Sequence, residues 1–261
     1  MNDASASAER RLIVNADDLG MSESVNDAIF ELMEAELVTS STILANGIAA
    51  AEAARSAKRF THCSFGVHLN LTSGRPVGPP GPLHSLLDET GQFTTGVFGI
   101  AGSRGLAKAV AAEWCAQVEA VRSLGVRISH FDSHEHVHTI PWVFTAFKSV
   151  QKQFGVRRAR LTKNVYCREV PAASPLLSTK KMLWNAALRH YYRTRTTRWF
   201  ADLYSVSRAA HERTLGSGSI EAMVHPGASA EPINVTELEE LRGGVLERLP
   251  FRIRMISYHE L

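Results

Sequence analysis

The sequence predicts an α/β protein with a (β/α) barrel-like architecture, open or closed, and an active site at the carboxyl ends of its strands. Short apolar runs alternate with helical patterns along most of the 261 residues. This alternation is typical of parallel sheets with right-handed crossovers. Several apolar runs also end abruptly in Asp, Asn or His, and such strand ends form the catalytic rim of barrel enzymes. A doubly wound sheet is the alternative.

The expected strands and helices alternate along the chain. Strand-like apolar runs lie at residues 11–16, 42–45, 64–71, 126–131, 158–161, 220–224 and 253–258. Apolar residues at helical spacing lie at 25–32, 48–58, 106–124, 141–154 and 238–249. Ser24 is placed to cap the first helix, Pro141 to begin the fourth, and Gly155 to end it. No linker or internal repeat divides the chain, so we expect one domain over 1–261 with a flexible leader at 1–10.

One segment, residues 171–215, interrupts the alternation and is interpreted as an insertion. It is rich in Lys, Arg and aromatic residues, and residues 181–189 have the pattern of an amphipathic helix. Two interpretations remain open. The segment is either a solvated face with its aromatic side chains packed beneath it, or a surface that contacts an anionic membrane or a lipid-linked substrate.

The composition narrows the class of protein. A hydrophobic content of 44% with 21% charged residues is typical of soluble globular proteins. The net charge of +3 is too small to indicate nucleic-acid binding. The three cysteines are scattered as expected of reduced thiols, and no run approaches the ~20 apolar residues of a membrane span. We therefore expect a cytoplasmic protein, and we expect it to form a homodimer.

The densest polar motif lies at residues 128–141, where four of the eleven histidines fall within nine consecutive residues. Asp132 and the three following histidines alternate, so an extended backbone would place them on one face. These histidines are His134, His136 and His138. Burying unpaired imidazoles is costly, which favours a metal or acid–base site over an ordinary core strand. A His-rich surface loop is the alternative, and His136 and His138 receive no assigned role.

Polar side chains end five of the expected strands: Asp17 with Asp18, Asn46, His68, Asp132 with His134, and His225. One carboxylate and two imidazoles can hold a divalent metal and leave positions for water. A second carboxylate can serve as general base and an opposed histidine as general acid. Each residue also has a purely structural interpretation. The aspartates could interact with the dipole at a helix N-terminus, His68 could be a hydrogen-bonded core residue, and His225 could be a turn residue.

Five blocks of the chain resemble signature motifs of the YdjC-like carbohydrate deacetylases, a family that includes chito-oligosaccharide deacetylases. The blocks are residues 15–20 (NADDLG), 66–72 (GVHLNLT), 132–138 (DSHEHVH), 223–227 (MVHPG) and 256–261 (ISYHEL). The resemblance covers nearly the whole chain and is weakest over 171–215. It implies a barrel-like fold and a hydrolase that removes N-acetyl groups from an acetamido sugar or oligosaccharide, with release of acetate.

The resemblance also implies one divalent metal ion, Mg²⁺ or Zn²⁺. The residues that match the family's ligand positions are Asp18, His68 and His134. Glu135 stands where several family members have another histidine. It is not an expected ligand, so this departure is expected to alter only the hydrogen bonds around the site.

Asp17 matches the position of the general base, and His225 matches that of the general acid. We further expect Asn46 and Arg160 to contact the substrate. Two alternatives remain. A non-haem iron oxygenase uses the same two histidines and one carboxylate, but it has no need of a second Asp and an opposed His. The second alternative is a non-catalytic metal-containing protein that binds sugar or lipid. Such a protein could lose the second Asp or the opposed His, whereas this chain retains both.

Overall fold

The computed structural model describes residues 9–227 and 232–261. Its seven strands form one sheet in the order β4-β3-β2-β1-β6-β5, with β7 paired to β1. The strands are β1 (Arg10–Leu19), β2 (Ser40–Ile43), β3 (Ser64–Leu69), β4 (Ile128–Ser133), β5 (Trp199–Asp202), β6 (Ile220–Val224) and β7 (Ile253–Met255). Every pairing is parallel. Their carboxyl ends therefore share one edge.

The sheet curls without closing into a complete barrel. Beyond β4, the predicted strand at 158–161 makes only single bridges, from Ala159 to Phe131 and from Arg158 to Arg195. The backbone N–H of Asn164 then donates to the carbonyl of Phe200 in β5 (3.0 Å). The prediction of an α/β, barrel-like parallel fold is confirmed in its open form.

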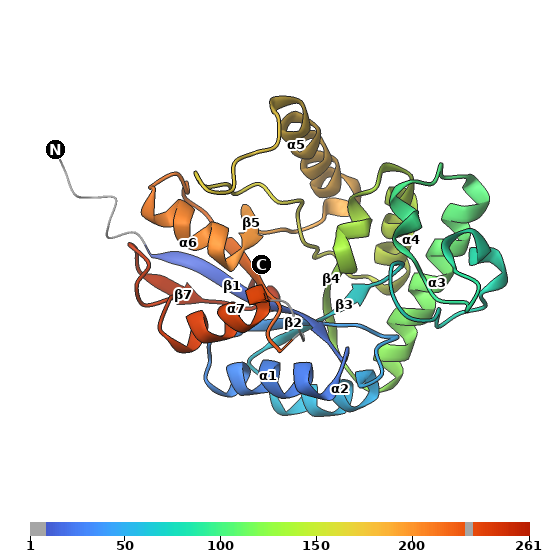
Figure 1. Ribbon diagram of the computed structural model, residues 1–261, viewed down its shortest axis with the longest axis horizontal. Helices are drawn as coiled ribbons and strands as arrows, with labels where there is room; N and C mark the ends of the chain where they lie inside the picture. The colour runs from blue at the N-terminus through green and yellow to red at the C-terminus, as the bar shows by residue number, and fades with distance from the viewer. Residues whose placement is uncertain (1–8, 228–231) are drawn as a thin grey trace.

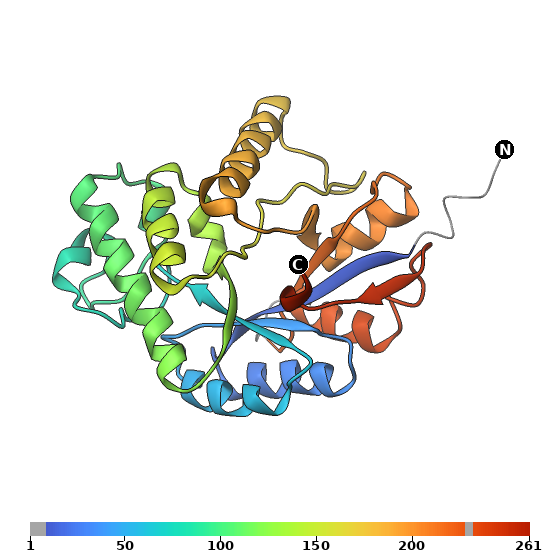
Figure 2. The ribbon, with the colours of Figure 1, turned by 180° about the vertical axis from the view of Figure 1, so that it is seen from behind.

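Seven α-helices of the described residues surround this sheet, as Figure 1 shows in outline. They are α1 (Glu23–Glu34), α2 (Ala50–Ser56), α3 (Arg104–Ser123), α4 (Phe144–Phe154), α5 (Pro175–His190), α6 (Leu203–His211) and α7 (Pro232–Arg242). Helices α1 and α2 cover one face, while α3 and α4 pack together beside β3 and β4 (Figures 1 and 2). No helix among the described residues has the length and apolar character needed to cross a bilayer.

Some of the residues predicted to begin or end helices do so in the structure, and others do not. The cap of α1 is Ser22, whose side chain accepts the N–H of Val25, so the prediction of Ser24 is wrong by two positions. Gly155 ends α4 in a left-handed conformation as predicted. Pro141 begins a short 3₁₀ turn that leads into α4. The predicted insertion at 171–215 contains β5 and α6, so the sheet continues through its second half.

Two buried histidines give the fold a pH dependence. His130 and His138 are both 0% exposed, each with Nδ1 against a serine hydroxyl. The His130 ring also stacks on Tyr258 at 3.6 Å. Burial and the charges of neighbouring cationic groups hold the pKa of His130 well below its usual value. Burial has the same effect on the pKa of His138. Both rings are therefore neutral in the folded protein.

These two rings take up protons on unfolding below pH ~6.5, the pKa of a free histidine. We therefore expect each to lower the free energy of unfolding by about 1.4 kcal/mol per pH unit below that value. Urea unfolding between pH 6 and pH 5 should show a smaller pH slope for His130→Phe than for wild type. The exposed His84→Phe is the control. Equal slopes for wild type and His130→Phe would contradict this assignment.

Candidate metal and acid–base site

The site begins at the end of β1, where Asp17 and Asp18 are adjacent. Neighbouring side chains on a strand point to opposite faces. Asp18, however, has a φ of 65°, a left-handed conformation that Asp adopts more readily than most residues. Both carboxylates consequently face His68, whose Nε2 lies 3.9 Å from Asp17 Oδ2 and 3.3 Å from Asp18 Oδ1. Both aspartates are buried.

Three donor atoms converge beside Asp18. Its Oδ1 lies 2.9 Å from Nδ1 of His134, and the ligand atoms of Asp18, His68 and His134 all lie within 4.8 Å of one another. A carboxylate oxygen with two imidazole nitrogens suits a divalent ion that keeps positions open for water. The His134 side chain is 16% exposed, so this group is open on one side. The residues present therefore fit a metal ion.

A second group, formed by Asp17, His68 and Asp132, is less suited to a metal. Both of its carboxylates already pair with Arg160. Asp132 also accepts hydrogen bonds from the hydroxyl of Thr42 (3.0 Å) and, at 2.7 Å, from Nδ1 of His68. Asp132 therefore orients the ring of His68. This leaves Nε2 of His68 facing the first group, as in most metal-binding histidines.

The charges around His68 favour a cation at this position. Burial alone would lower the pKa of His68, but the charges of Asp132 and Asp17 raise it to about 9. The buried carboxylates beside the ring thus stabilise a positive charge at Nε2. A metal ion held there would supply that charge in place of the proton, so its binding would release a proton.

The His-rich motif does not form an extended face. The strand ends before His134, and Glu135 and His136 adopt φ values of 47° and 56° in a 3₁₀ turn. The expectation that the alternating residues share one face is therefore wrong, because two consecutive left-handed residues interrupt the extended backbone. His138 is buried, and the His136 ring packs edge-on against Phe200. Among these histidines, His134 is the one that meets Asp18.

Arg160 lies beneath the site with its guanidinium 0% exposed. It donates to both carboxylate oxygens of Asp17 (2.5 and 2.6 Å), pairs with Asp132 (2.8 Å), and donates to Glu221 (2.7 Å). Glu221 also accepts the hydroxyl hydrogen of Tyr258 (2.5 Å). Because all of these groups are buried, Arg160 holds Asp17 in a fixed orientation. The expected contact of Arg160 with a substrate stays a prediction.

The same network sets the charge of Asp17. Burial alone would raise the pKa of Asp17, but the charge and hydrogen bonds of Arg160, with the charge of His68, hold it well below its usual range. Asp17 is therefore a carboxylate at any physiological pH. Sequence reasoning missed Glu221 and Tyr258 as members of the network. The available signal was a Glu within the apolar run at 220–224, which is unusual for a buried strand.

His225 lies across the site at the end of β6. Its Nε2 is 3.8 Å from Asp17 Oδ2, and its ring is 30% exposed. Glu237 in α7, also missed by sequence reasoning, accepts the backbone N–H of His225 (2.7 Å) and lies 3.8 Å from Nδ1. Burial by itself would lower the pKa of His225, but Glu237 and the two site aspartates raise it above its usual value. These carboxylates therefore stabilise the protonated form of the His225 ring.

Asn46 braces a loop. Its Nδ2 donates to the carbonyls of Ser73 (2.8 Å) and Arg75 (3.0 Å), and its Oδ1 accepts from Asn70 (2.9 Å). Since its amide is bonded within the protein, the structure gives it the role of holding this loop against the strand ends. The expected contact of Asn46 with the substrate stays a prediction.

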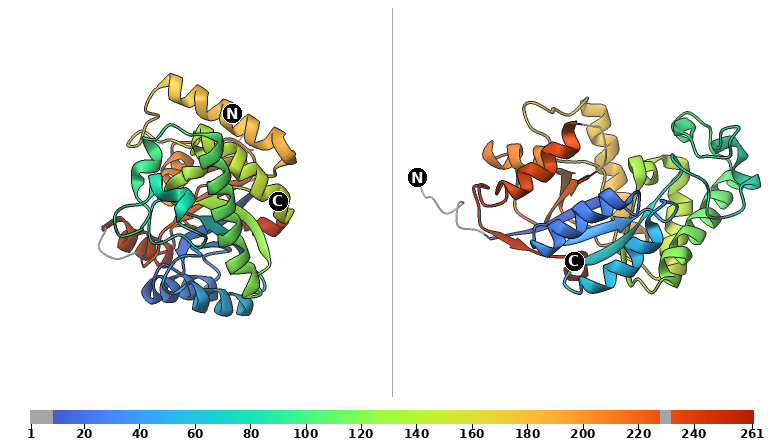
Figure 3. Two further views of the ribbon diagram at one scale, coloured as in Figure 1. Left: turned by 90° about the vertical axis from the view of Figure 1, so that its right-hand side faces the viewer. Right: turned by 60° about the horizontal axis from the view of Figure 1, so that its bottom comes forward.

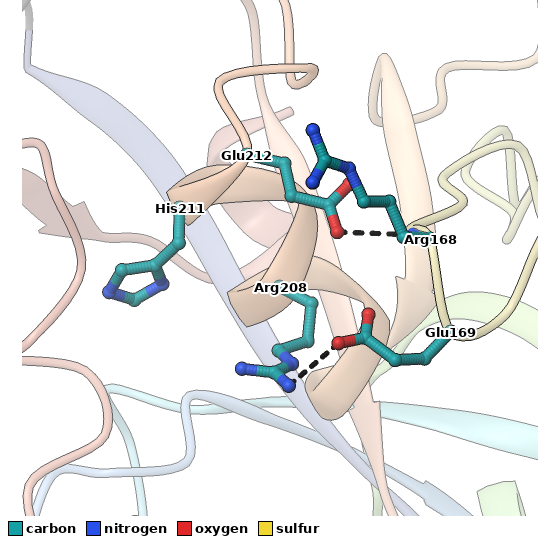
Figure 4. A pocket seen from close by; sticks show the side chains of 5 residues that line it. All are labelled: Arg168, Glu169, Arg208, His211 and Glu212. Carbon is teal, nitrogen blue, oxygen red and sulfur yellow. Dashed lines mark hydrogen bonds and ion pairs between the residues drawn. The ribbon is translucent and has the colours of Figure 1, made fainter.

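A separate surface pocket of about 450 Å³ is lined by residues of α6, the residue that follows it, and the 168–169 segment (Figure 4). They are Arg168, Glu169, Arg208, His211 and Glu212. Arg208 pairs with Glu169 at 2.7 Å, and Glu212 accepts the backbone N–H of Arg168. These mixed charges compensate one another at the surface, and none of these residues belongs to the Asp–His site.

The fold and site together define an open parallel α/β protein with a carboxylate–histidine cluster at the carboxyl edge of its sheet. The chain belongs to the YdjC-like protein family, whose model matches residues 11–250. It is 32% identical to the carbohydrate deacetylase of Homo sapiens over 259 residues, covering 85% of this chain and 76% of that protein. The resemblance inferred from the sequence motifs is thereby confirmed.

Other relatives match over shorter regions. The chain is 39% identical to the carbohydrate deacetylase of Geobacillus stearothermophilus over 145 residues, 56% of this chain and 57% of that one. This chain matches only 50–61% of the length of three such carbohydrate deacetylases. A crystal structure of an Enterococcus faecalis V583 protein, named as a candidate for cellobiose-phosphate cleavage, superposes with a TM-score of 0.74. It is 22% identical and covers 97% of this chain and 99% of its own, which supports the fold.

The ligand assignment predicts the loss of metal from three variants: Asp18→Ala, His68→Ala and His134→Ala. Loss of a residue that only orients a metal ligand lowers metal affinity ~10–100-fold, and each of these substitutions should lower it by more. His134 is the least buried of the three residues, so His134→Ala should have little effect on folding. Elemental analysis after dialysis, with the exposed His84→Ala as control, checks this. Full metal occupancy in all three variants would contradict the assignment.

Proposed function

We propose that the protein is a metal-dependent hydrolase that removes the N-acetyl group from an acetamido sugar or oligosaccharide. Acetate and a free amine would be the products. The observation that carries this proposal is that two adjacent aspartates have different partners. Asp18 joins the two histidines of the metal-binding group, whereas Asp17 is held by Arg160 and faces the same space. The names of the relatives support a carbohydrate substrate and deacetylation.

The metal-binding residues are Asp18, His68 and His134. A divalent ion held there would act as a Lewis acid toward the amide carbonyl and lower the pKa of a water molecule. Two imidazole ligands favour Zn²⁺ or another transition metal, while the carboxylate and open water positions are compatible with Mg²⁺.

The pKa shifts of Asp17 and His225 support the roles that we propose for these two residues. Asp17 is ionised and fixed in orientation by Arg160, so it accepts the proton of the attacking water. The nearby carboxylates raise the pKa of His225, which suits it to donate the proton that the departing amine requires. The 3.8 Å between His225 Nε2 and Asp17 Oδ2 supports the proposal that the two groups act on the same substrate atom group.

This arrangement favours hydrolysis over the two alternatives. An iron oxygenase does not need a buried Arg160 that holds a second aspartate beside the ligands. A non-catalytic sugar- or lipid-binding protein does not need a base and a protonated histidine facing each other. The buried pairing of Arg160 and Asp17 is costly to maintain unless the carboxylate is used.

The test is a panel of N-acetylglucosamine oligomers, monosaccharides, and lipid- or nucleotide-linked acetamido sugars, incubated in ¹⁸O-labelled water with and without chelator. We expect metal-dependent release of acetate that carries one labelled oxygen from at least one soluble member of the panel. Oxygen consumption in place of labelled acetate would identify an oxygenase. Sugar binding with no acetate from any member would identify a binding protein.

The homodimer remains a prediction, and sedimentation of the full chain checks it.

His225→Ala should retain the metal and lose ~10²–10⁴-fold in turnover, the usual effect of removing a positioned acid. Glu237→Gln keeps an acceptor for the backbone N–H of His225 but removes the negative charge near its ring. Because that charge raises the pKa of His225, the alkaline limb of kcat/KM should move to lower pH in Glu237→Gln. An active His225→Ala enzyme, or an unshifted limb in Glu237→Gln, would remove His225 as the acid.

A further inference from the structure

An exposed apolar face lies on α5 and its flanks. Six of the ten large hydrophobic side chains that are exposed among the described residues fall between 170 and 191: Val170, Leu176, Leu177, Met182, Leu183 and Tyr191. Leu176, Met182 and Leu183 are each more than 60% exposed. Within α5 only Asn185 and Leu188 are buried. The helix projects at the top of the molecule in Figure 1 and lies across it in the left view of Figure 3. We call Leu176, Leu177, Met182, Leu183 and Tyr191 the α5 face.

The opposite side of α5 is firmly attached. The Asn185 side chain accepts both the N–H and the hydroxyl hydrogen of Thr162 (3.0 Å each). Lys148 in α4 donates to the carbonyl of Leu188 (2.8 Å), and the Trp184 ring packs edge-on against Phe144. The aromatic Trp184 is thus packed beneath the helix, as one interpretation of this segment expected. The aliphatic side chains point outward on a helix whose position is fixed.

Positive charge surrounds the α5 face. Residues 171–201 contain six Lys or Arg and no Asp or Glu. Lys180, Arg189 and Arg193 are exposed, and none of these three forms an ion pair with any residue in 9–227 or 232–261. Lys180 lies between Leu176 and Leu183, one helical turn from each. An apolar helix face bordered by unpaired cations is typical of helices that lie at an anionic membrane surface.

We propose that the α5 face docks on the surface of an anionic lipid bilayer. Charge complementarity selects this partner. A second copy of the chain would meet the same face in a two-fold contact, which would bring two clusters of unpaired cations together. An anionic bilayer instead accepts the leucines at the headgroup boundary while its phosphates pair with Lys180 and Arg193. This proposal is independent of the deacetylase chemistry.

The test is co-sedimentation of the full chain with vesicles of phosphatidylcholine, alone or mixed with phosphatidylglycerol, at low and moderate salt. We expect binding to the mixed vesicles only, weakened by salt because the charges are exposed. Each cation removed should weaken partition about fivefold, so Lys180→Gln/Arg193→Gln should bind roughly 25-fold more weakly. Leu176→Asn/Leu183→Asn should bind at least ~10-fold more weakly. Phe98→Asn and Lys108→Gln alter exposed residues elsewhere and should bind as wild type does.

Two outcomes would overturn the proposal. One is equal binding to neutral and anionic vesicles, or no binding to either, at low salt. The other is self-association of the wild-type chain that is lost in Leu176→Asn/Leu183→Asn, which would make the α5 face a homodimer interface. Circular dichroism establishes that the variants fold. Acetate release from a soluble substrate should be unchanged in them, so failure of the membrane proposal is distinguishable from failure of the proposed activity.

Discussion

Asp17→Asn is expected to bind metal as the wild type does and to lose ~10²–10⁴-fold in turnover, the usual effect of removing a positioned base. The substitution preserves the size of the side chain and one oxygen acceptor for Arg160. It removes the negative charge that would accept a proton. Metal content and acetate release, measured on the same preparation, separate these two functions.

The matched control is Asp18→Asn, which alters the neighbouring aspartate in the metal-binding group. It should lose metal and activity together, whereas Asp17→Asn should lose activity alone. Acetate release close to that of wild type in Asp17→Asn would show that another group is the base. Loss of metal in Asp17→Asn would place Asp17 among the ligands.

Arg160→Met is expected to lower the free energy of unfolding by about 3–5 kcal/mol, the usual result of removing one partner from a buried ion pair. Asp17, Asp132 and Glu221 would be left without the cation that each contacts. Arg160→Lys retains the charge but cannot reproduce the two-pronged contact with Asp17, so it should recover only part of the stability and little activity. Urea unfolding and acetate release check the two effects.

The control for Arg160 is Arg157→Met, which removes an exposed arginine from the same segment. It should change the free energy of unfolding by no more than about 0.5 kcal/mol. If Arg160→Met were as stable as wild type and raised KM alone, Arg160 would contact the substrate as first expected. That result would contradict its role beneath the site.

The architecture and the central cluster could be predicted because they depend on local patterns. Apolar runs bounded by polar residues define parallel strands, and the strand ends of a parallel sheet must share an edge. That reasoning brought Asp17, Asp18, His68, His134 and His225 together, and the structure places them within a few ångströms of one another.

The remaining features depend on contacts between residues far apart in the sequence. Arg160 is buried because three carboxylates from three different segments surround it, whereas a lone arginine is expected at the surface. The left-handed turn at Glu135 and His136 has no glycine to signal it, so the motif resembled a strand. Ser22 and Ser24 are both suitable caps by residue type, so the sequence alone does not distinguish them, and the structure has Ser22 as the cap.

The most direct test of metal-dependent deacetylation is a metal titration of the chelated wild-type chain, with bound metal and acetate release measured at each step. Acetate release should rise in proportion to bound metal and reach its maximum at one ion per chain. His134→Ala should show neither binding nor activity over the same range. Acetate release that persists in the fully chelated chain, or one bound ion per chain without acetate release from any acetamido sugar, would contradict metal-dependent deacetylation.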